Sequence, residues 1–191
     1  MPELFFIYFL VLFILLPLAL LFKLPFFVIK ILLIVFAVII IIPLIRTLFS
    51  APFVPSKKDR VKNMLKLADL NKNKKVVELG CGDARILRQA AKKGVKSAVG
   101  YELSIALFFY TKILIFLQRN PARIYLKDIW KQDYSQVDVV FSYLLPMVMP
   151  KVKSKIWEQL KPGARFITNA FPLPEVTEDQ KIDKVYLYIK K

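Results

Sequence analysis

The sequence contains no histidine and a single cysteine. Histidine is the usual general base near neutral pH and the commonest metal ligand, so its absence removes both roles from the chain. The single cysteine, Cys81, excludes an internal disulfide and any zinc site built from several cysteines. We therefore expect no metal-dependent chemistry.

Acidic residues are scarce. The chain has 30 Lys and Arg against 14 Asp and Glu, and after residue 50 the balance is 27 basic to 13 acidic, or +14. Such a chain attracts polyanions such as anionic lipid headgroups or nucleic acid, unless its charges form a solvated surface without a partner. The lysines are dispersed and lack the interleaved aromatics that stack bases, which disfavours nucleic acid.

The first fifty residues carry few charges and two long apolar runs. Leu4 to Phe22 is a run of 19 residues without a charge, about 28 Å as a helix and close to the ~30 Å hydrocarbon core of a bilayer. The second run, Phe26 to Ile45, is interrupted only by Lys30, whose long side chain can snorkel to an interface. We expect residues 1–50 to form a transmembrane hairpin anchor, with one span and an interfacial helix as the alternative.

Basic residues crowd the end of this apolar region. They are Arg46, Lys57, Lys58, Arg60 and Lys62. The positive-inside rule then predicts a membrane localisation with the second domain, residues 51–191, on the cytoplasmic side. A cleaved signal peptide is disfavoured because residues 1–3 carry no basic residue and the apolar region is too long.

After residue 50 the pattern alternates between strands and helices. We expect strands at 75–79, 97–101, 122–126, 137–142, 164–168 and 184–189, and helices at 56–70, 84–93, 104–118 and 147–160. A variant capping box of Ser56 and Asp59 predicts the start of the first helix. Continuous apolar strands such as "VDVVFSYLL" are typical of a parallel sheet covered on both faces, so the fold class is a doubly wound α/β fold. The helix at 104–118 is apolar nearly all round, which implies a further apolar partner: the anchor, a bilayer or a second copy.

The first strand leads into "VVELGCGDARIL", residues 76–87. In a doubly wound sheet, ligands bind at the carboxyl ends of the strands, so the two glycines leave a bare backbone where a ligand can approach. The alternative is a tight turn whose glycines only allow positive φ. Glu102 ends the next strand, in "AVGYELS", where a carboxylate can accept hydrogen bonds from a ribose diol.

A nicotinamide or flavin dinucleotide fits this turn poorly. The fingerprint G-x-G-x-x-G requires glycine at position 85, which is Arg85. Glu78 would also face a pyrophosphate with the wrong charge. An acid at that position suits a ligand that carries an ammonium and a sulfonium, which is S-adenosylmethionine.

The motif "VVELGCGDA" resembles motif I of the class I S-adenosylmethionine-dependent methyltransferases, with Ala84 in place of the final glycine, and "LKPGARF" resembles the turn before their fifth strand. A series of five segments resembles the small membrane-anchored protein-lysine methyltransferases, in which similar segments occur in the same order. These segments are "PFVPS", "VELGCGDARIL", "AVGYELS", "KDIWK" and "GARFITNAFPLP". The mitochondrial members of that group modify the adenine nucleotide translocase and the c-subunit of ATP synthase. The resemblance covers most of residues 52–188 and implies a Rossmann-like methyltransferase sheet.

The resemblance also implies site residues. Those that would bind the cofactor are Glu78, Gly80, Cys81 and Gly82 at the methionine moiety, Glu102 and Leu103 at the ribose, and Asp128, Ile129 and Trp130 at the adenine. Core packing is the alternative role for Trp130. Cys81 is disfavoured as a nucleophile because nothing nearby in the sequence supplies a base.

Methyl transfer from a sulfonium is an in-line displacement, so the protein contributes alignment and desolvation. An acceptor lysine is about three pKa units from its neutral form, and a low-dielectric pocket beside the positive cofactor lowers that pKa without a dedicated base. We expect Ser142 and Tyr143, after the fourth strand, to line the site of the acceptor amine. The segment "SYLLP" at this place differs from the Asn/Asp-Pro-Pro-Tyr motif of adenine and glutamine methyltransferases, which disfavours DNA adenine and glutamine as acceptors. The sequence thus predicts a protein-lysine methyltransferase. The alternatives are a lipid or quinone methyltransferase and a non-catalytic S-adenosylmethionine-binding protein.

Overall fold

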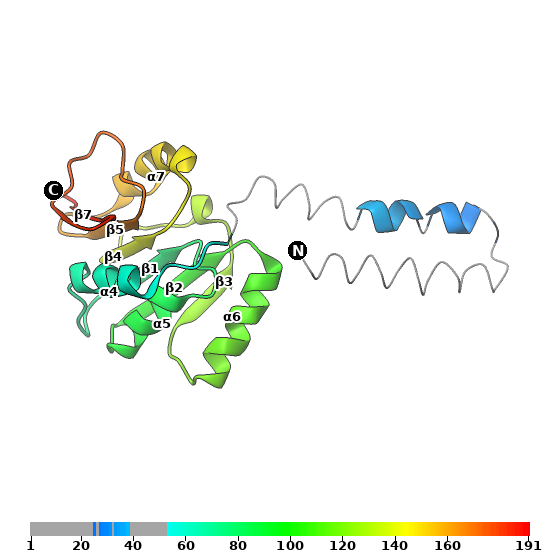
Figure 1. Cartoon of the computed structure of the whole chain (residues 1–191), viewed down its shortest axis with the longest axis horizontal. Helices are drawn as coiled ribbons and strands as arrows, with labels where there is room; N and C mark the ends of the chain where they lie inside the picture. Colours follow the sequence, from blue (N-terminus) through cyan, green and yellow to red (C-terminus); the bar gives the residue numbers. More distant parts are fainter. Residues whose placement is uncertain (1–24, 26, 32, 39–52) are drawn as a thin grey trace. The chain divides into compact units, whose positions relative to one another are not determined.

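The computed structural model describes residues 25, 27–31, 33–38 and 53–191 (Figure 1). The chain divides into two units, Met1–Pro52 and Phe53–Lys191, and each is described by itself. In the first unit, residues 27–31 and 33–38 are helical. The second unit contains the candidate site and all the strands that lie within the described residues.

The predicted membrane localisation has to be corrected. None of the helices within the described residues has both the length and the apolar composition that crossing a membrane requires. A transmembrane helix needs about 20 consecutive apolar residues. The predicted span Leu4 to Phe22 lies outside the described residues, and so do residues 26, 32 and 39–45 of the predicted span Phe26 to Ile45. We therefore do not assign the chain to a membrane.

The second unit is built on a seven-stranded sheet with the order β3-β2-β1-β4-β5-β7-β6. Its strands are β1 (Lys75–Leu79), β2 (Ser97–Glu102), β3 (Arg123–Leu126), β4 (Val139–Ser142), β5 (Arg165–Asn169), β6 (Gln180–Ile182) and β7 (Val185–Ile189). The first five strands are parallel, which gives the predicted Rossmann-like α/β arrangement. The order reverses direction beside β1, where ligands bind in such sheets.

The sheet is mixed, so the expectation of a purely parallel sheet was wrong. Both β7 against β5 and β6 against β7 run antiparallel. A parallel pair needs a crossover connection, usually a helix, whereas no helix lies between β5 and β7. The chain therefore returns as a hairpin of β6 and β7. The strand β6 was missed because three residues, "QKI", are too short to show a period.

Two cores cover the two faces of the sheet. On one face lie α4 (Lys58–Leu67), α5 (Arg85–Lys92) and α6 (Ile105–Leu117), and Figure 1 shows these three helices beside one another. On the other face lie η2 (Ile129–Lys131), α7 (Met149–Lys155) and η4 (Trp157–Gln159). Alternate strand residues point to opposite faces, so Val76 and Val77 join different cores.

The predicted helix at 147–160 is broken. The chain forms η3 (Pro146–Val148), α7 and η4 in place of one continuous helix. The predicted capping box is also absent, because α4 begins after Lys57 and has no side-chain cap. The hydroxyl of Ser56 bonds instead to Asn169, more than a hundred residues away in the chain.

Helix α6 presents most of its apolar side chains to solvent in the described part of the chain. Thr111 is its buried residue. The exposed ones are Ile105, Phe109, Tyr110, Ile113, Phe116 and Leu117. This agrees with the apolar composition read from the sequence on all sides of the helix.

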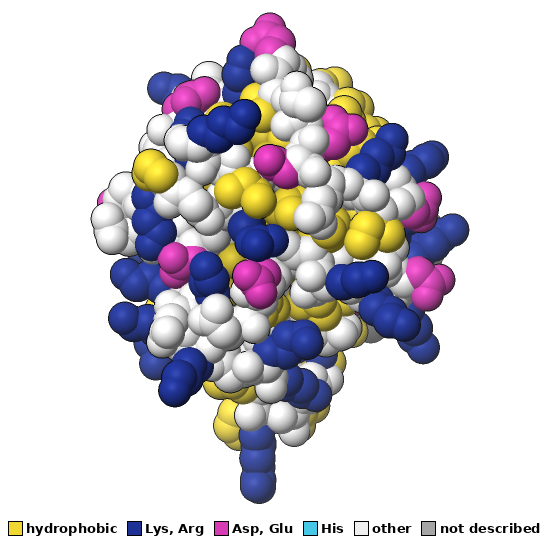
Figure 2. All heavy atoms as spheres, turned by 90° about the vertical axis from the view of Figure 1, so that its left-hand side faces the viewer, with side chains coloured by type: hydrophobic (Ala, Val, Ile, Leu, Met, Phe, Trp, Pro, Cys, Tyr) yellow, Lys and Arg dark blue, Asp and Glu magenta, His cyan; other side chains and the backbone are white. Residues whose placement is uncertain are grey.

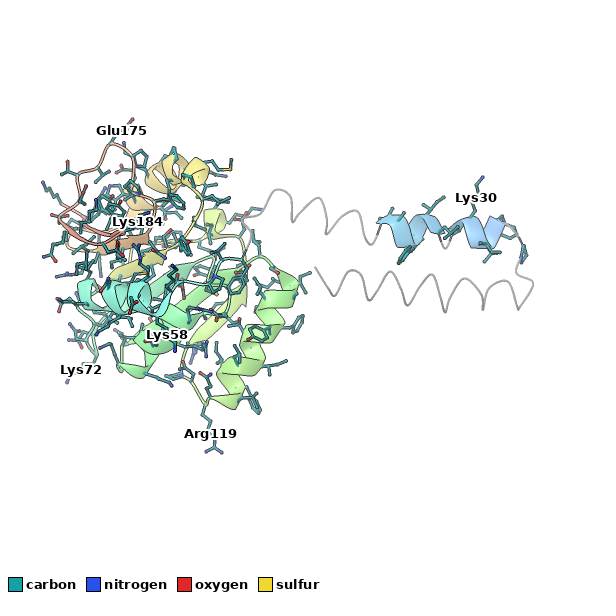
Figure 3. All side chains as sticks on the ribbon, in the orientation of Figure 1. Lys30, Lys58, Lys72, Arg119, Glu175 and Lys184 are labelled. Atoms are coloured by element: carbon teal, nitrogen blue, oxygen red, sulfur yellow. The ribbon has the colours of Figure 1, made fainter. Side chains whose placement is uncertain are left out.

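The basic residues are spread over the surface. Figure 2 shows Lys and Arg side chains scattered over one face of the molecule, with Asp and Glu between them and no single basic patch. Lys72, Arg119 and Glu175 point outward, away from the sheet (Figure 3). The observed pattern is that of dispersed charge, as the sequence predicted.

Candidate functional site

Three carboxylates follow three neighbouring strands. Glu78 lies near the end of β1, Glu102 ends β2, and Asp128 comes two residues after β3. The three strands are adjacent and parallel, with Glu78 paired to Gly100 and Glu102 paired to Leu126. The carboxyl ends of parallel strands meet at the same edge, so the fold brings these acids to one edge of the sheet.

The turn after β1 places alternate residues in the left-handed region. The φ angles are +60° at Gly80, +53° at Gly82 and +54° at Ala84. Glycine adopts this region freely, whereas a residue with a Cβ pays roughly 1–2 kcal/mol. Ala84 therefore carries strain at the position where the motif I pattern has glycine, and it does so as a fully buried residue at the start of α5.

The two glycines of the turn also face other parts of the protein closely. A Cβ added to Gly80 would lie 3.2 Å from Cδ2 of Leu144, and one added to Gly82 would lie 2.5 Å from Cε2 of Phe53. The positive φ angles bear out the tight-turn explanation, and the approach of a ligand to the bare backbone stays a prediction. The groups that approach within this structure are two apolar side chains, and they border the turn from the segment before α4 and the segment after β4.

The peptide groups of Gly82 are held on two sides. Its N–H donates to Oε2 of Glu102 at 2.8 Å, and its C=O accepts from the hydroxyl of Thr111 at 2.7 Å. Thr111 is fully buried in the otherwise apolar α6. The sequence reading missed this residue, although a threonine within the largely apolar "FFYTKILIF" was a visible signal.

Glu102 is therefore a structural centre of the site. Besides Gly82, its carboxylate accepts the N–H groups of Leu103 at 2.9 Å and Ser104 at 2.8 Å. A carboxylate offers about four lone-pair sites. One site remains after these three bonds, which leaves room for one hydroxyl group of a ligand.

Glu78 is buried beside the turn, and burial raises its pKa to about 8. Burial is the largest cause of this raised pKa. The negative charges of Asp83 and Glu102 also contribute to it, and the N–H of Leu87, 3.1 Å from Oε2, opposes it. A buried carboxylate of this kind is stabilised in its charged form by a nearby cation. This chemistry fits the ammonium and sulfonium of the expected cofactor.

Cys81 contributes its backbone to the turn and its side chain to the core. Its N–H donates to the C=O of Tyr101 at 3.0 Å. Its Sγ lies 2.8 Å from the place where a Cβ at Gly100 would be. Burial raises the pKa of the thiol above its usual range, so the structure agrees with the expectation that Cys81 is not a nucleophile.

Asp128, Ile129 and Trp130 form the turn that follows β3. Oδ1 of Asp128 accepts the N–H of Trp130 at 2.9 Å and caps η2. Trp130 is partly buried against the core, with Nζ of Lys151 4.4 Å from the centre of its ring. The core-packing alternative for Trp130 thus agrees with its environment, and its contact with an adenine ring stays a prediction.

Ser142 ends β4 and Tyr143 follows it, on the opposite side of β1 from Glu102. Ser142 is paired in the sheet with Leu79 and Thr168. Its hydroxyl is buried and has no hydrogen-bond partner among the described residues. Buried hydroxyls are normally bonded, so an unpaired one at the edge of a site favours a contact with a bound molecule.

We expect Thr111→Val to destabilise the fold by roughly 1–3 kcal/mol, because it leaves the buried C=O of Gly82 without its donor. Thr111→Ser retains the hydroxyl and is the matched control. Urea unfolding of the full chain measures both variants. Equal stability of the Val and Ser variants would show that the hydroxyl bond contributes nothing.

The raised pKa of Glu78 predicts that the stability of the fold depends on pH. Its ordinary pKa is 4.5 and its pKa in the folded protein is about 8, so between these values the folded state holds one more proton than the unfolded chain. The contribution of Glu78 to stability is therefore greatest below pH 4.5 and falls as the pH rises through this window. We expect Glu78→Gln to gain stability over the natural chain by up to about 5 kcal/mol between about pH 5 and about pH 8.5. A difference that stays constant with pH in urea unfolding contradicts the assignment.

Comparisons with known proteins agree with this geometry. The family model of the ANTKMT methyltransferase domain matches residues 78–180. The ATP synthase c-subunit lysine N-methyltransferase of Rattus norvegicus is 35% identical over 143 residues, which cover 72% of this chain and 65% of that enzyme. A protein-lysine N-methyltransferase of Saccharolobus islandicus is 32% identical over 151 residues, which cover 72% of this chain and 92% of that enzyme.

A solved structure is similar over nearly its whole length. It is an RNA methyltransferase from Salinibacter ruber in complex with S-adenosyl-L-homocysteine, with 30% identity and a TM-score of 0.68, and the match covers 71% of this chain and 93% of that one. The match to the rat enzyme spans slightly less than two thirds of its length. The resemblance seen in the motifs is confirmed: this chain belongs to the ANTKMT methyltransferase domain family, whose cofactor is S-adenosylmethionine.

Proposed function

We propose that this chain is an S-adenosylmethionine-dependent protein-lysine N-methyltransferase and that residues 53–191 carry the activity. The observation that carries the proposal is the row of carboxylates Glu78, Glu102 and Asp128 at the ends of three adjacent strands, beside a turn with left-handed glycines. The row offers acceptors for the cationic, ribose and adenine parts of one ligand. The family's lysine-methylating members support the same chemistry.

We assign the cofactor contacts in the same order as the strands. Glu78 lies nearest the turn and faces the ammonium and sulfonium, with Gly80, Cys81 and Gly82 as the backbone beneath the methionine moiety. Glu102 and Leu103 take the ribose, because Glu102 keeps one acceptor site. Asp128 accepts from the adenine amino group, while Ile129 and Trp130 flank the ring. When bound, the cofactor supplies an electrophilic methyl group.

The acceptor amine then enters beside Ser142 and Tyr143. A lysine near neutral pH needs about 4 kcal/mol to lose its proton. Burial among apolar groups such as Leu144, next to a cationic cofactor, disfavours the ammonium and lowers the pKa of the amine. The unpaired hydroxyl of Ser142 can accept a hydrogen bond from the amine and orient its lone pair toward the methyl group. The chain therefore needs no histidine.

RNA is the second candidate acceptor. The Salinibacter ruber relative is an RNA methyltransferase, and this chain has a net charge of +16. Protein lysine is favoured over RNA because the positive charges are dispersed and because the relatives from Rattus norvegicus and Saccharolobus islandicus are protein-lysine enzymes.

Methyl-labelled S-adenosylmethionine tests the acceptor. We expect the full chain, incubated with a cell extract and the labelled cofactor, to place label in protein as acid-stable methyllysine. Label that ribonuclease removes would indicate RNA, and label that organic solvent extracts would indicate a lipid or quinone. Transfer to no fraction would favour a cofactor-binding protein without catalysis. Each of these three results would overturn the proposal.

The role of Tyr143 is tested with a single variant. We expect Tyr143→Ala to lower transfer at least about tenfold, since alignment of the amine is lost, while cofactor affinity stays within about twofold. Lys72→Ala, at an outward-pointing side chain (Figure 3), is the control and should retain both properties. Transfer at the natural rate in the Tyr143 variant would remove this residue from the acceptor site.

A further inference from the structure

The segment Phe53–Ser56, here called the strap, lies directly on the glycine turn. Cε2 and Cδ2 of Phe53 are 2.5 Å and 2.8 Å from the place where a Cβ on Gly82 would be. The ring therefore occupies the space that the missing side chain of Gly82 leaves free. Phe53 is still 45% exposed, so part of the ring remains open on its outer side.

Ser56 anchors the other end of the strap. It is buried, and both its side-chain and backbone oxygens are bound: its C=O accepts from Nη1 of Arg85 at 2.8 Å, and its Oγ accepts from Nδ2 of Asn169 at 3.3 Å. Arg85 belongs to the start of α5, directly after the turn, and Asn169 ends β5. Three distant segments of the chain thus meet at one serine.

Arg85 is held in place from the turn. Its Nε lies 3.0 Å from Oδ1 of Asp83, and its Nη2 lies 2.9 Å from Oδ2 of the same residue. This two-point contact fixes the plane of the guanidinium, which leaves Nη1 aimed at Ser56. The strap is therefore tied to the turn by Arg85 and to the sheet by Asn169.

We propose that the strap forms a wall of the cofactor site, with Phe53 as a cofactor-binding residue and Arg85 and Asn169 as positioning residues. Gly82 shares the carboxylate of Glu102 with the proposed ribose contact, so a ring resting on Gly82 lies next to a ligand bound there. An apolar ring in this place excludes water and strengthens the attraction between Glu78 and the cationic cofactor. The inference rests on the proposed S-adenosylmethionine site and does not depend on the methyl acceptor.

The extended strap suits this role. Val54 precedes Pro55, and a residue before proline is confined to extended backbone. The strap therefore has few alternative conformations to lose when a ligand binds. In the sequence the same segment, "PFVPS", is the first of the motifs that resemble the methyltransferase group, and no role for Phe53 could be inferred from it.

Calorimetry on the full chain, titrated with S-adenosylmethionine and with S-adenosylhomocysteine, tests whether the strap contributes to cofactor binding. We expect Phe53→Ala to weaken both ligands about tenfold, while the melting temperature of the ligand-free protein changes little because the ring is half exposed. Phe116→Ala, the same exchange at an exposed ring of α6 outside the strap, is the matched control and should bind within about twofold of the natural chain. Unchanged affinity of the Phe53 variant would overturn the proposal.

A double-mutant cycle tests whether Asn169 acts through the strap. Asn169 bonds to Ser56 and not to the turn, so Asn169→Ala loosens the strap alone. We expect it to weaken cofactor binding about threefold in the natural chain and to have no effect in the Phe53→Ala background. The same non-additivity is expected for Arg85→Lys, which keeps the charge and loses the two-point geometry.

Additive effects in these cycles would mean that Arg85 and Asn169 act on the fold without the strap, and would overturn their positioning role. The measurements use binding only, so they are independent of methyl transfer. If the natural chain methylates no lysine but Phe53→Ala still weakens cofactor binding, the proposed acceptor is refuted and the proposal for the strap stands. The reverse result would refute the strap and leave the enzyme assignment in place.

Discussion

The hydrogen bond between the carboxylate of Glu102 and the N–H of Gly82 is the contact on which the site depends. It joins the end of β2 to the turn after β1, and it exists because those two strands are parallel neighbours. With the hydroxyl of Thr111 on the other side of the same residue, it fixes a turn that carries three left-handed residues. The direction of Glu78 and the place of Phe53 both follow from the position of this turn.

In the proposed site, electrostatics is expected to determine which ligand binds. The chain carries a net charge of +16, yet the carboxyl edge of β1 to β3 collects three acids, one of them buried with a pKa of about 8. A buried acid of this kind disfavours phosphate-rich ligands and favours a cation. The fold thus gathers acids at one edge of a basic protein, and a bound cation would favour the charged form of Glu78, which fits a cofactor with an ammonium and a sulfonium.

Much of the fold could be predicted from the sequence because its local signals are strong. The strand β1 was predicted with its observed bounds, and α5 and α6 within one residue at each end, since period and glycine positions mark their limits. The incorrect predictions concern segments whose structure depends on contacts between residues far apart in the sequence. Ser56 bonds to Asn169 and caps no helix, the predicted helix at 147–160 is broken into η3, α7 and η4, and β6 is paired with β7. The membrane localisation, inferred from apolar length and from the basic residues that follow it, was wrong on the described residues.

By itself the sequence determined the class of the fold and the positions of Glu78, Glu102 and Asp128, because alternating periods and an acid before two glycines are local properties of a chain. Only the tertiary structure decided that Phe53 lies on Gly82, that Thr111 holds the turn, and that Arg85 and Asn169 meet at Ser56. These contacts join residues 29 to 113 positions apart. Their hydrogen-bond geometry depends on the packing of whole helices and strands, which no local pattern encodes.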